Sequence, residues 1–206
     1  MRAPVKLFLA SSNPGKLKEY RALVENAAPS SSTSAELELL PEIGSLPAFE
    51  ENAPTFAENA AGKALHYSRW SEGLVFADDS GLVVPTLGGA PGVLSARHAG
   101  ADATDSQRIE KLLNEMRNRA DQERSAHFVC AIALARKGRA LAVVTDRVDG
   151  EILESTTGGG GFGYDPVFYF PALKKTFAEL SAAEKNRHSH RGKAFRKLLA
   201  ALSSML

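Results

Sequence analysis

Apolar positions along the 206-residue chain follow two different periods. Short, largely apolar segments at residues 5–10 and 74–77 are typical of short buried strands. Longer runs at residues 127–135 and 140–153 are rich in β-branched side chains, and the short link between them near Gly138 predicts an antiparallel hairpin. The strand pattern therefore combines short segments in the first half with one long pair in the second.

Elsewhere the apolar residues recur every three or four positions, which predicts amphipathic helices. Helices are expected directly after the first strand, over residues 59–70, around residues 109–116 and after residue 194. Residues 55–58 and 104–107 have the capping-box pattern that begins helices. Helices that alternate with strands, together with the antiparallel pair, predict an α/β fold with a mixed sheet flanked by helices.

No internal repeat and no long linker interrupts this pattern, so we expect a single domain over residues 1–206. Residues 29–47 are rich in Ser, Glu and Pro and have no clear pattern, although a strand could form within residues 35–40. The sequence Asp-Asp-Ser-Gly at residues 78–81 predicts a turn, after which the strand resumes in residues 82–87.

The charges nearly balance, but they are unevenly placed. The 25 Lys and Arg residues and 24 Asp and Glu residues give a net charge of +1, which argues against a dedicated nucleic-acid binder. Residues 36–58 hold six Glu and no basic residue, whereas residues 185–197 hold six Lys or Arg and two His. Two patches of opposite sign fit a metal-assisted site for a polyanion, although solvated faces give the same pattern.

Cysteine content and hydropathy indicate the compartment. Cys130 is the only cysteine, lies in an apolar run and is expected to be a buried, unreactive thiol. A chain without an intrachain disulfide fits a reducing compartment. No apolar run approaches the ~18 residues of a membrane-spanning helix, and the N-terminus lacks the features of a signal peptide. We therefore expect a cytoplasmic protein with no membrane partner.

The first candidate site is the turn between the first strand and the first helix. Free backbone amides and the positive helix end converge at such a turn, which suits a phosphate. Hydroxyl, amide and ammonium groups add further donors. The segment comprises Ser11, Ser12, Asn13, Pro14, Gly15 and Lys16. It lacks the spacing of a Walker A loop, and an ordinary capped turn would have a similar sequence.

Two adjacent carboxylates, Asp78 and Asp79, follow the buried run at residues 74–77. Adjacent carboxylates are costly unless they are solvated or neutralised, and Mg²⁺ is a natural partner for hard oxygen ligands. Successive strand residues point to opposite faces, so the two acids are expected to differ in role. One would hold metal while the other orients or deprotonates water. A structural turn that ends the strand is the alternative.

Three further charged residues are weaker candidates. Glu50 and Glu51 precede the helix that begins near residue 55, and either could complete a metal site with Asp79. Lys63 lies within that helix and could reach a phosphate. Solvated loop acids and a solvent-facing lysine explain the same residues equally well.

Glycines dominate residues 158–163, which match G-x-G-x-x-G literally. The match is weak because Pro166 disfavours the helix that a dinucleotide fingerprint must open. A loop that brings its backbone close to a flat ligand is the better interpretation, with Phe162 stacking on a base and Asp165 accepting hydrogen bonds. A glycine hairpin with a core phenylalanine is the alternative.

The basic segment at residues 185–193 precedes the C-terminal helix. Cationic side chains at a helix start oppose the helix dipole, and a bound anion would offset that cost. His190 and Arg191 could contact a phosphate or a purine carbonyl oxygen. An exposed basic capping segment is the alternative.

Taken together, these segments resemble the inosine triphosphate pyrophosphatase family. The matching stretches occur in family order and cover nearly the whole chain: ASSNPGKLKEY, EENAPTFAENAAGKA, FADDSGLVVPTLGGAPGVLSAR, GGFGYDPVF and FAELSAAEKNRHSHRGKA. The resemblance implies hydrolysis of ITP, dITP and XTP to the monophosphate and pyrophosphate, which clears deaminated purines from the nucleotide pool. It also implies a Mg²⁺ requirement, a homodimer, and an elongated fold with a cleft between two lobes.

The resemblance assigns roles by position. The implied triphosphate-binding residues are Ser11, Ser12, Asn13, Pro14, Gly15, Lys16, Lys63 and Ser80. Asp79 would be the general base and a metal-linked acid, with Asp78 beside it and Glu50 or Glu51 joining the metal. The implied base-framing residues are Phe162, Gly163, Tyr164 and Asp165. The residues that complete the base and phosphate contacts would be Lys185, His190 and Arg191.

Two other functions remain open from the sequence. A pyrophosphatase for modified pyrimidine triphosphates would need similar phosphate chemistry. A non-catalytic nucleotide sensor could use the same basic and glycine-rich loops, although the acidic pair Asp78 and Asp79 argues against a pure binder because acids beside phosphates need a metal.

Overall fold

The computed structural model describes residues 4–25, 35–117 and 123–205 of the chain. Its strands form one seven-stranded sheet with the order β2-β1-β3-β4-β5-β6-β7. The strands are β1 (Val5–Leu9), β2 (Ala35–Leu39), β3 (Leu74–Val83), β4 (Ser125–Arg136), β5 (Arg139–Ile152), β6 (Phe168–Phe170) and β7 (Lys175–Thr176). The α-helices are α1 (Pro14–Glu25), α2 (Phe56–Tyr67), α3 (Asp105–Arg117), α4 (Ala182–His188) and α5 (His190–Met205).

The sheet is mixed, as the sequence predicts. β1 pairs in parallel with both β2 and β3, whereas β3, β4, β5, β6 and β7 pair antiparallel in succession. The predicted hairpin is β4 and β5, and the tentative strand at residues 35–40 is β2. The two short strands β6 and β7 were not predicted, because two or three residues are too few to show a period.

The predicted turn at residues 78–81 is wrong. β3 continues through these residues to Val83, and Asp78, Asp79 and Ser80 pair with Ile132, Ala131 and Cys130 of β4. The long partner strand β4 satisfies the backbone groups of this polar stretch, so tertiary pairing overrides its turn propensity. Two carboxylates are thereby placed in the middle of a sheet.

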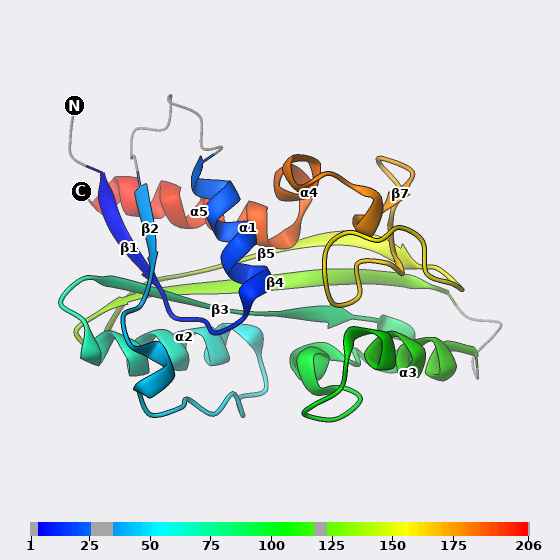
Figure 1. The fold of residues 1–206 in the computed structure, drawn as a ribbon, viewed down its shortest axis with the longest axis horizontal. Helices are drawn as coiled ribbons and strands as arrows, with labels where there is room; N and C mark the ends of the chain where they lie inside the picture. The colour runs from blue at the N-terminus through cyan, green and yellow to red at the C-terminus, as the bar shows by residue number, and fades with distance from the viewer. Residues whose placement is uncertain (1–3, 26–34, 118–122, 206) are drawn as a thin grey trace.

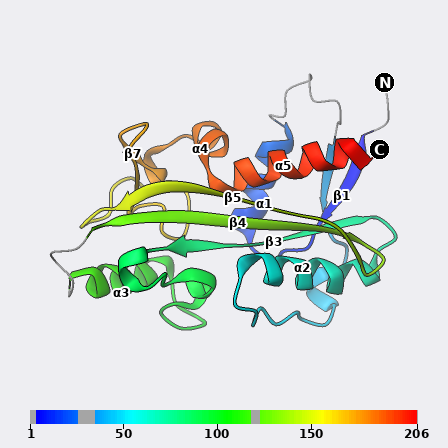
Figure 2. The ribbon, with the colours of Figure 1, turned by 180° about the vertical axis from the view of Figure 1, so that it is seen from behind.

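Helices cover both faces of this sheet (Figures 1 and 2). α1 and α5 lie on one face, and one hydrophobic cluster there joins Tyr20 of α1 and Phe195 of α5 to Phe76 of β3. α2 packs on the other face, where Ala60 and Ala64 belong to a second cluster. The small alanine side chains of β3 and β4 in that cluster allow α2 to approach the sheet closely.

A third cluster lies toward the α3 end of the elongated molecule (Figure 1). It joins the buried stripe of α3, which the sequence predicts, to the aromatic side chains Phe128, Phe168 and Phe177. This cluster is separate from the other two, which lie on the two faces of the sheet around β1 and β3. The sheet therefore has hydrophobic cores toward both of its ends.

Helix boundaries follow the predicted caps. Thr55 accepts a hydrogen bond from the Glu58 N–H at the start of α2, and Thr104 and Gln107 bond reciprocally before α3. The basic segment is divided between two helices, with Lys185 in α4 and His190 as the first residue of α5. Within the described residues, no helix is both long and apolar enough to cross a membrane.

Candidate functional site

A cavity of about 320 Å³ lies beside the middle of β3, between the N-terminal ends of α1, α3 and α5 and residues of α2, α4 and the loop around Phe162. Most of the predicted site residues line it: Ser11, Ser12, Asn13, Lys16, Glu51, Lys63, Asp79, Ser80, Phe162, Gly163, Tyr164, Asp165, Lys185, His190 and Arg191. Four predicted residues are not among its lining: Pro14, Gly15, Glu50 and Asp78. Segments that are far apart in sequence therefore converge on one concave site.

The turn before α1 has the geometry of a helix N-terminus open to a ligand. Asn13 caps the helix, because its Oδ1 accepts the Lys16 N–H at 3.1 Å and its backbone oxygen accepts the Leu17 N–H at 3.1 Å. The Asn13 N–H itself donates to Ser11 Oγ at 3.2 Å. Pro14 is the first helical residue, where its missing N–H costs nothing.

Gly15 contributes by having no side chain. A Cβ at this position would lie 2.9 Å from Cδ1 of Phe162, which real Cβ atoms do not tolerate. The glycine therefore lets the Phe162 ring lie directly against the first turn of α1.

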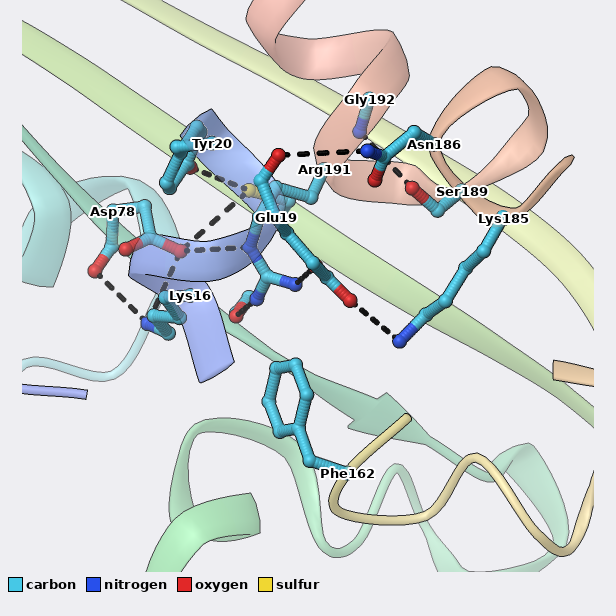
Figure 3. Close-up of polar contacts among 12 residues, drawn as sticks. Lys16, Glu19, Tyr20, Asp78, Phe162, Lys185, Asn186, Ser189, Arg191 and Gly192 are labelled. Atoms are coloured by element: carbon cyan, nitrogen blue, oxygen red, sulfur yellow. Dashed lines mark hydrogen bonds and ion pairs between the residues drawn. The ribbon is translucent and has the colours of Figure 1, made fainter. Parts of the chain in front are cut away.

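Asp78 and Asp79 point to opposite faces of β3, as alternation along a strand requires. Asp78 is fully buried on the α1 and α5 face, where its Oδ2 lies 3.1 Å from Lys16 Nζ and 3.5 Å from Arg191 Nε (Figure 3). Burial alone would raise the pKa of Asp78, but the charges of Lys16 and Arg191 hold it below its ordinary value. Asp78 is thus an ionised anchor behind the cavity, and this position argues against its predicted place among the metal ligands.

Asp79 faces the cavity from the opposite side of the strand and is 5% exposed. Its Oδ2 accepts a hydrogen bond from Asn59 Nδ2 at 2.9 Å, and its Oδ1 accepts the Ser80 N–H at 2.9 Å. Burial raises the pKa of Asp79 to about 6, with smaller contributions in the same direction from the Glu51 and Asp78 charges. A carboxylate with this pKa is suited to accept a proton near neutral pH.

The adjacent residues Glu50 and Glu51 lie in different environments. Glu51 lines the cavity and forms an ion pair with Lys63 of α2, and its backbone oxygen accepts a hydrogen bond from Arg97 Nη2 at 2.7 Å. Glu50 instead accepts a hydrogen bond from exposed Asn52. The structure therefore favours Glu51 over Glu50 as the residue that acts in the cavity.

Glu19 of α1 joins basic residues of two other helices, α4 and α5, and was not predicted as a site residue. From α1 its Oε1 lies 2.6 Å from Lys185 Nζ, and its Oε2 pairs with Arg191 Nη1 (Figure 3). Lys185 also pairs with Asp165. The only signal in the sequence is that Glu19 adjoins Tyr20 on the buried side of α1, which is weak because most helix glutamates are solvated.

The predicted basic segment is not an exposed cap. Lys185, His190 and Arg191 are at most 5% exposed. The His190 ring stacks on Phe128 at 4.7 Å between ring centroids. Burial, together with the charges of Arg191 and Lys185, lowers the pKa of His190 well below its ordinary value. His190 therefore presents a neutral imidazole to the cavity, while the positive charge comes from its neighbours.

Phe162 is partly buried and lies close to two cationic side chains. Lys185 Nζ is 4.8 Å and the guanidinium carbon of Arg191 is 5.6 Å from the centre of its ring, which points toward these cations (Figure 3). Asp165 holds the loop by accepting the Phe162 N–H at 2.8 Å. Phe162 belongs to none of the three hydrophobic clusters.

The cavity suits a polyanion and one divalent cation. Six cationic side chains (Lys16, Lys63, Arg97, Arg108, Lys185, Arg191) and four carboxylates (Glu51, Asp79, Asp105, Asp165) line it. Among the residues that the structure describes, no group of three or more His, Cys, Asp or Glu side chains forms a complete metal cluster. The Glu51 and Asp79 carboxylates nevertheless share one cavity, and two hard oxygen donors are enough for Mg²⁺ when water and phosphate complete its shell.

Comparison with known proteins finds full-length relatives. The model of the Ham1 family matches residues 7–201. A dITP/XTP pyrophosphatase from Geobacillus kaustophilus is 47% identical over 193 residues, which cover 94% of this chain and 92% of the relative. Another of the same name, from Gloeobacter violaceus, is 48% identical over 207 residues, which cover 96% and 94%.

Solved structures of Ham1 proteins have the same fold as this chain. The structure of a HAM1 protein from Coxiella burnetii superimposes with a TM-score of 0.83 at 40% identity, covering 97% of this chain and 99% of that one. The Staphylococcus aureus Ham1 protein gives a TM-score of 0.82 at 37% identity, covering 98% and 100%.

Proposed function

Because this chain belongs to the Ham1 family, we propose that it hydrolyses dITP, XTP and ITP to the monophosphate and pyrophosphate. The observation that carries the proposal is the placement of Asp79, oriented by Asn59 and by the Ser80 N–H, in a cavity that several lysine and arginine side chains also line. An oriented carboxylate base beside groups that bind phosphate is what hydrolysis of a phosphoric anhydride requires.

Asp79 is the residue that we assign as general base. It accepts a proton from the attacking water while the water oxygen bonds to the α-phosphorus. The bond from the α-phosphorus to the oxygen that bridges to the β-phosphorus breaks, and pyrophosphate leaves. The hydrogen bonds from Asn59 and from the Ser80 N–H fix the direction of the Asp79 carboxylate.

Glu51 and Asp79 are the residues that would hold Mg²⁺. When bound there, the ion would neutralise phosphate charge. Lys63, which now pairs with Glu51, would be free to bind a phosphate oxygen once a cation takes its place beside the carboxylate.

The remaining phosphate contacts come from the first turn of α1 and the buried cations. Ser12 and Asn13 line the cavity directly before the N-terminus of α1, where the helix dipole favours a phosphate. Lys16 and Arg191 are held in place by Asp78, so they are ordered before substrate binds. This preorganisation would stabilise the charge that develops on the leaving pyrophosphate.

The base would stack on Phe162 and meet the loop that follows it. A purine 6-carbonyl accepts hydrogen bonds from backbone amides and basic side chains. The 6-amino group of adenine is itself a donor, so it cannot pair with these donors. Each buried donor left unpaired would weaken binding by about 1–3 kcal/mol. The neutral state of His190 fits contact with an uncharged base rather than with a phosphate.

Four further properties belong to the same proposal. We propose that Mg²⁺ is the metal, that the protein is a homodimer in the cytoplasm, and that residues 1–206 act as one domain. One continuous sheet supports the last point. Light scattering after size-exclusion chromatography would measure the mass in solution. A monomer at micromolar concentration would refute the proposed homodimer.

The test of the function is pyrophosphate release from dITP, XTP, ITP, GTP, ATP and dUTP, with Mg²⁺ and with EDTA. Metal-dependent release with the first three far ahead of the others supports the proposal. Preference for dUTP or another pyrimidine would indicate a pyrimidine pyrophosphatase. Tight binding of dITP without release from any substrate would indicate a nucleotide sensor.

A further inference from the structure

Asp105 connects the glycine-rich loop at residues 158–163 to helix α3, and both line the cavity. The catalytic and binding roles proposed above do not include Asp105. It is the first residue of α3, and its Oδ2 accepts a hydrogen bond from the Gly163 N–H at 2.6 Å. Gly163 directly follows Phe162 in the chain. We propose that Asp105 is a positioning residue that holds this loop, and with it the Phe162 ring, in the orientation that receives the base. The inference rests on the proposed function, since it takes Phe162 as the stacking residue.

The Asp105 carboxylate is itself held by a second residue. Its Oδ1 pairs with Arg108 Nη2, and Arg108 Nη1 also donates to the backbone oxygen of Ala96 at 2.9 Å. The two carboxylate oxygens thus have separate partners, one within α3 and one in the loop. A carboxylate in the first turn of a helix is also favoured by the helix dipole. The acceptor for the Gly163 N–H is therefore fixed in place before any ligand binds.

The loop needs such an acceptor because its sequence gives it little stiffness. Residues 158–163 contain five glycines, and Gly163 has a left-handed φ of +63°. Glycine-rich backbone loses a large conformational entropy when it is ordered. Each fixed hydrogen bond removes part of that cost from the binding step.

Other contacts also hold the loop, and two of them involve residues next to Gly163. Asp165 accepts the Phe162 N–H and pairs with Lys185 of α4. The Tyr164 hydroxyl donates to the backbone oxygen of Ser95 at 3.0 Å. The Asp105 bond comes from α3, which lies on the opposite side of the sheet from α4 (Figures 1 and 2). The two peptide groups that flank Phe162 are therefore each held by a carboxylate, one by Asp165 and the other by Asp105.

The expected consequence is an effect on binding rather than on the chemical step. Without the Asp105 bond, the Phe162 ring leaves its contact with Gly15 and Lys185 more often, and the nucleotide must order the loop. We expect KM and Kd for dITP to rise about three- to tenfold when the bond is removed, with kcat within about twofold. The side chain of Asp105 is 42% exposed, so its removal should be tolerated by the fold.

The experiment compares Asp105→Ala and Asp105→Asn with Glu110→Ala, which removes an exposed carboxylate further along α3. Asparagine keeps an acceptor for the Gly163 N–H, so it should restore most of the loss. Steady-state kinetics give KM and kcat for dITP, and calorimetry in EDTA gives Kd for dITP without turnover. Amide hydrogen exchange of Gly163 in nucleotide-free protein reports the bond itself, with the Phe162 amide as internal reference.

The result expected is faster Gly163 exchange and raised KM and Kd in Asp105→Ala, with Asp105→Asn close to the unmodified protein and Glu110→Ala unchanged. Unchanged Gly163 exchange in Asp105→Ala would overturn the proposed contact. Faster exchange with unchanged KM and Kd would overturn its role in base binding. Absence of hydrolysis by the unmodified protein would instead refute the proposed function, and the exchange and Kd measurements would still decide the role of Asp105.

Discussion

The amide of Asn59 lies 2.9 Å from the carboxylate of Asp79, measured from Nδ2 to Oδ2. Asn59 is fully buried in α2, and its Oδ1 also accepts the Ala53 N–H at 2.9 Å. One side chain therefore fixes the assigned base relative to the segment that carries Glu51. Its position in the Ala-rich α2 helix gave no indication of this role.

Asn59→Ala should lower kcat about tenfold and change KM little, because the Asp79 carboxylate loses its orienting donor. It should also lower the free energy of unfolding by about 1–3 kcal/mol, since the Ala53 N–H loses its acceptor. Kinetics below the melting temperature of the variant separate the two effects. Asn52→Ala, which removes an exposed amide bonded to Glu50, is the matched control. An unchanged kcat in folded Asn59→Ala would show that Asp79 does not need this partner.

Asp79→Asn should abolish most turnover while making the metal-free protein more stable. Loss of a general base lowers kcat by about 100-fold or more. The pKa of Asp79 is about 6 in the folded protein against its ordinary value of 3.8, so ionisation costs folding energy as pH rises. The cost is absent below about pH 4 and reaches about 3 kcal/mol above pH 6.

Thermal unfolding in EDTA at several pH values tests this second effect. Asp79→Asn should melt higher than the unmodified protein at pH 7, and the two should converge near pH 4. A variant that is less stable at pH 7 would show that Asp79 contributes more through its hydrogen bonds than its buried charge costs. Near-normal kcat would contradict its assignment as the base.

Glu51→Gln should raise the Mg²⁺ concentration for half-maximal activity about tenfold or more, since a carboxylate ligand becomes a neutral amide. Glu50→Gln is a matched control one residue away, and it should leave this concentration unchanged because Glu50 does not line the cavity. Titration of each variant with Mg²⁺ at saturating dITP makes the comparison. Equal shifts in the two variants would argue that general negative charge matters rather than a specific ligand.

Phe162→Ala should raise KM about tenfold with a smaller effect on kcat, because stacking on an aromatic ring contributes about 1–3 kcal/mol per base. Trp70→Ala removes an aromatic ring that is 57% exposed and does not line the cavity, and it controls for general effects. Steady-state kinetics with dITP decide the matter. If KM did not change, packing against Gly15 would be the main role of Phe162.

Most of the residues that the sequence predicts for the site line one cavity, because local chemistry marks them. Ser11 to Lys16 combine cap, turn and phosphate donors within one short segment, and Phe162 stands alone among glycines. Glu19, Asn59 and Asp105 were missed because each is an ordinary helix residue by sequence. Their partners lie on other elements, so only the contacts distinguish them.

By itself, the sequence determined the mixed α/β fold, the long hairpin and the helix caps, because periodicity and capping depend on neighbours a few residues apart. The family followed from the resemblance of five sequence segments. The tertiary structure alone decided that residues 78–81 continue a strand, since pairing with β4 outweighs their turn propensity. It also placed Glu51, but not Glu50, in the cavity lining. Strand alternation predicted that Asp78 and Asp79 face opposite sides, but only the tertiary structure placed Asp78 among buried cations and Asp79 toward the cavity. Their charge states follow from burial and from partners distant in sequence, which no local pattern contains.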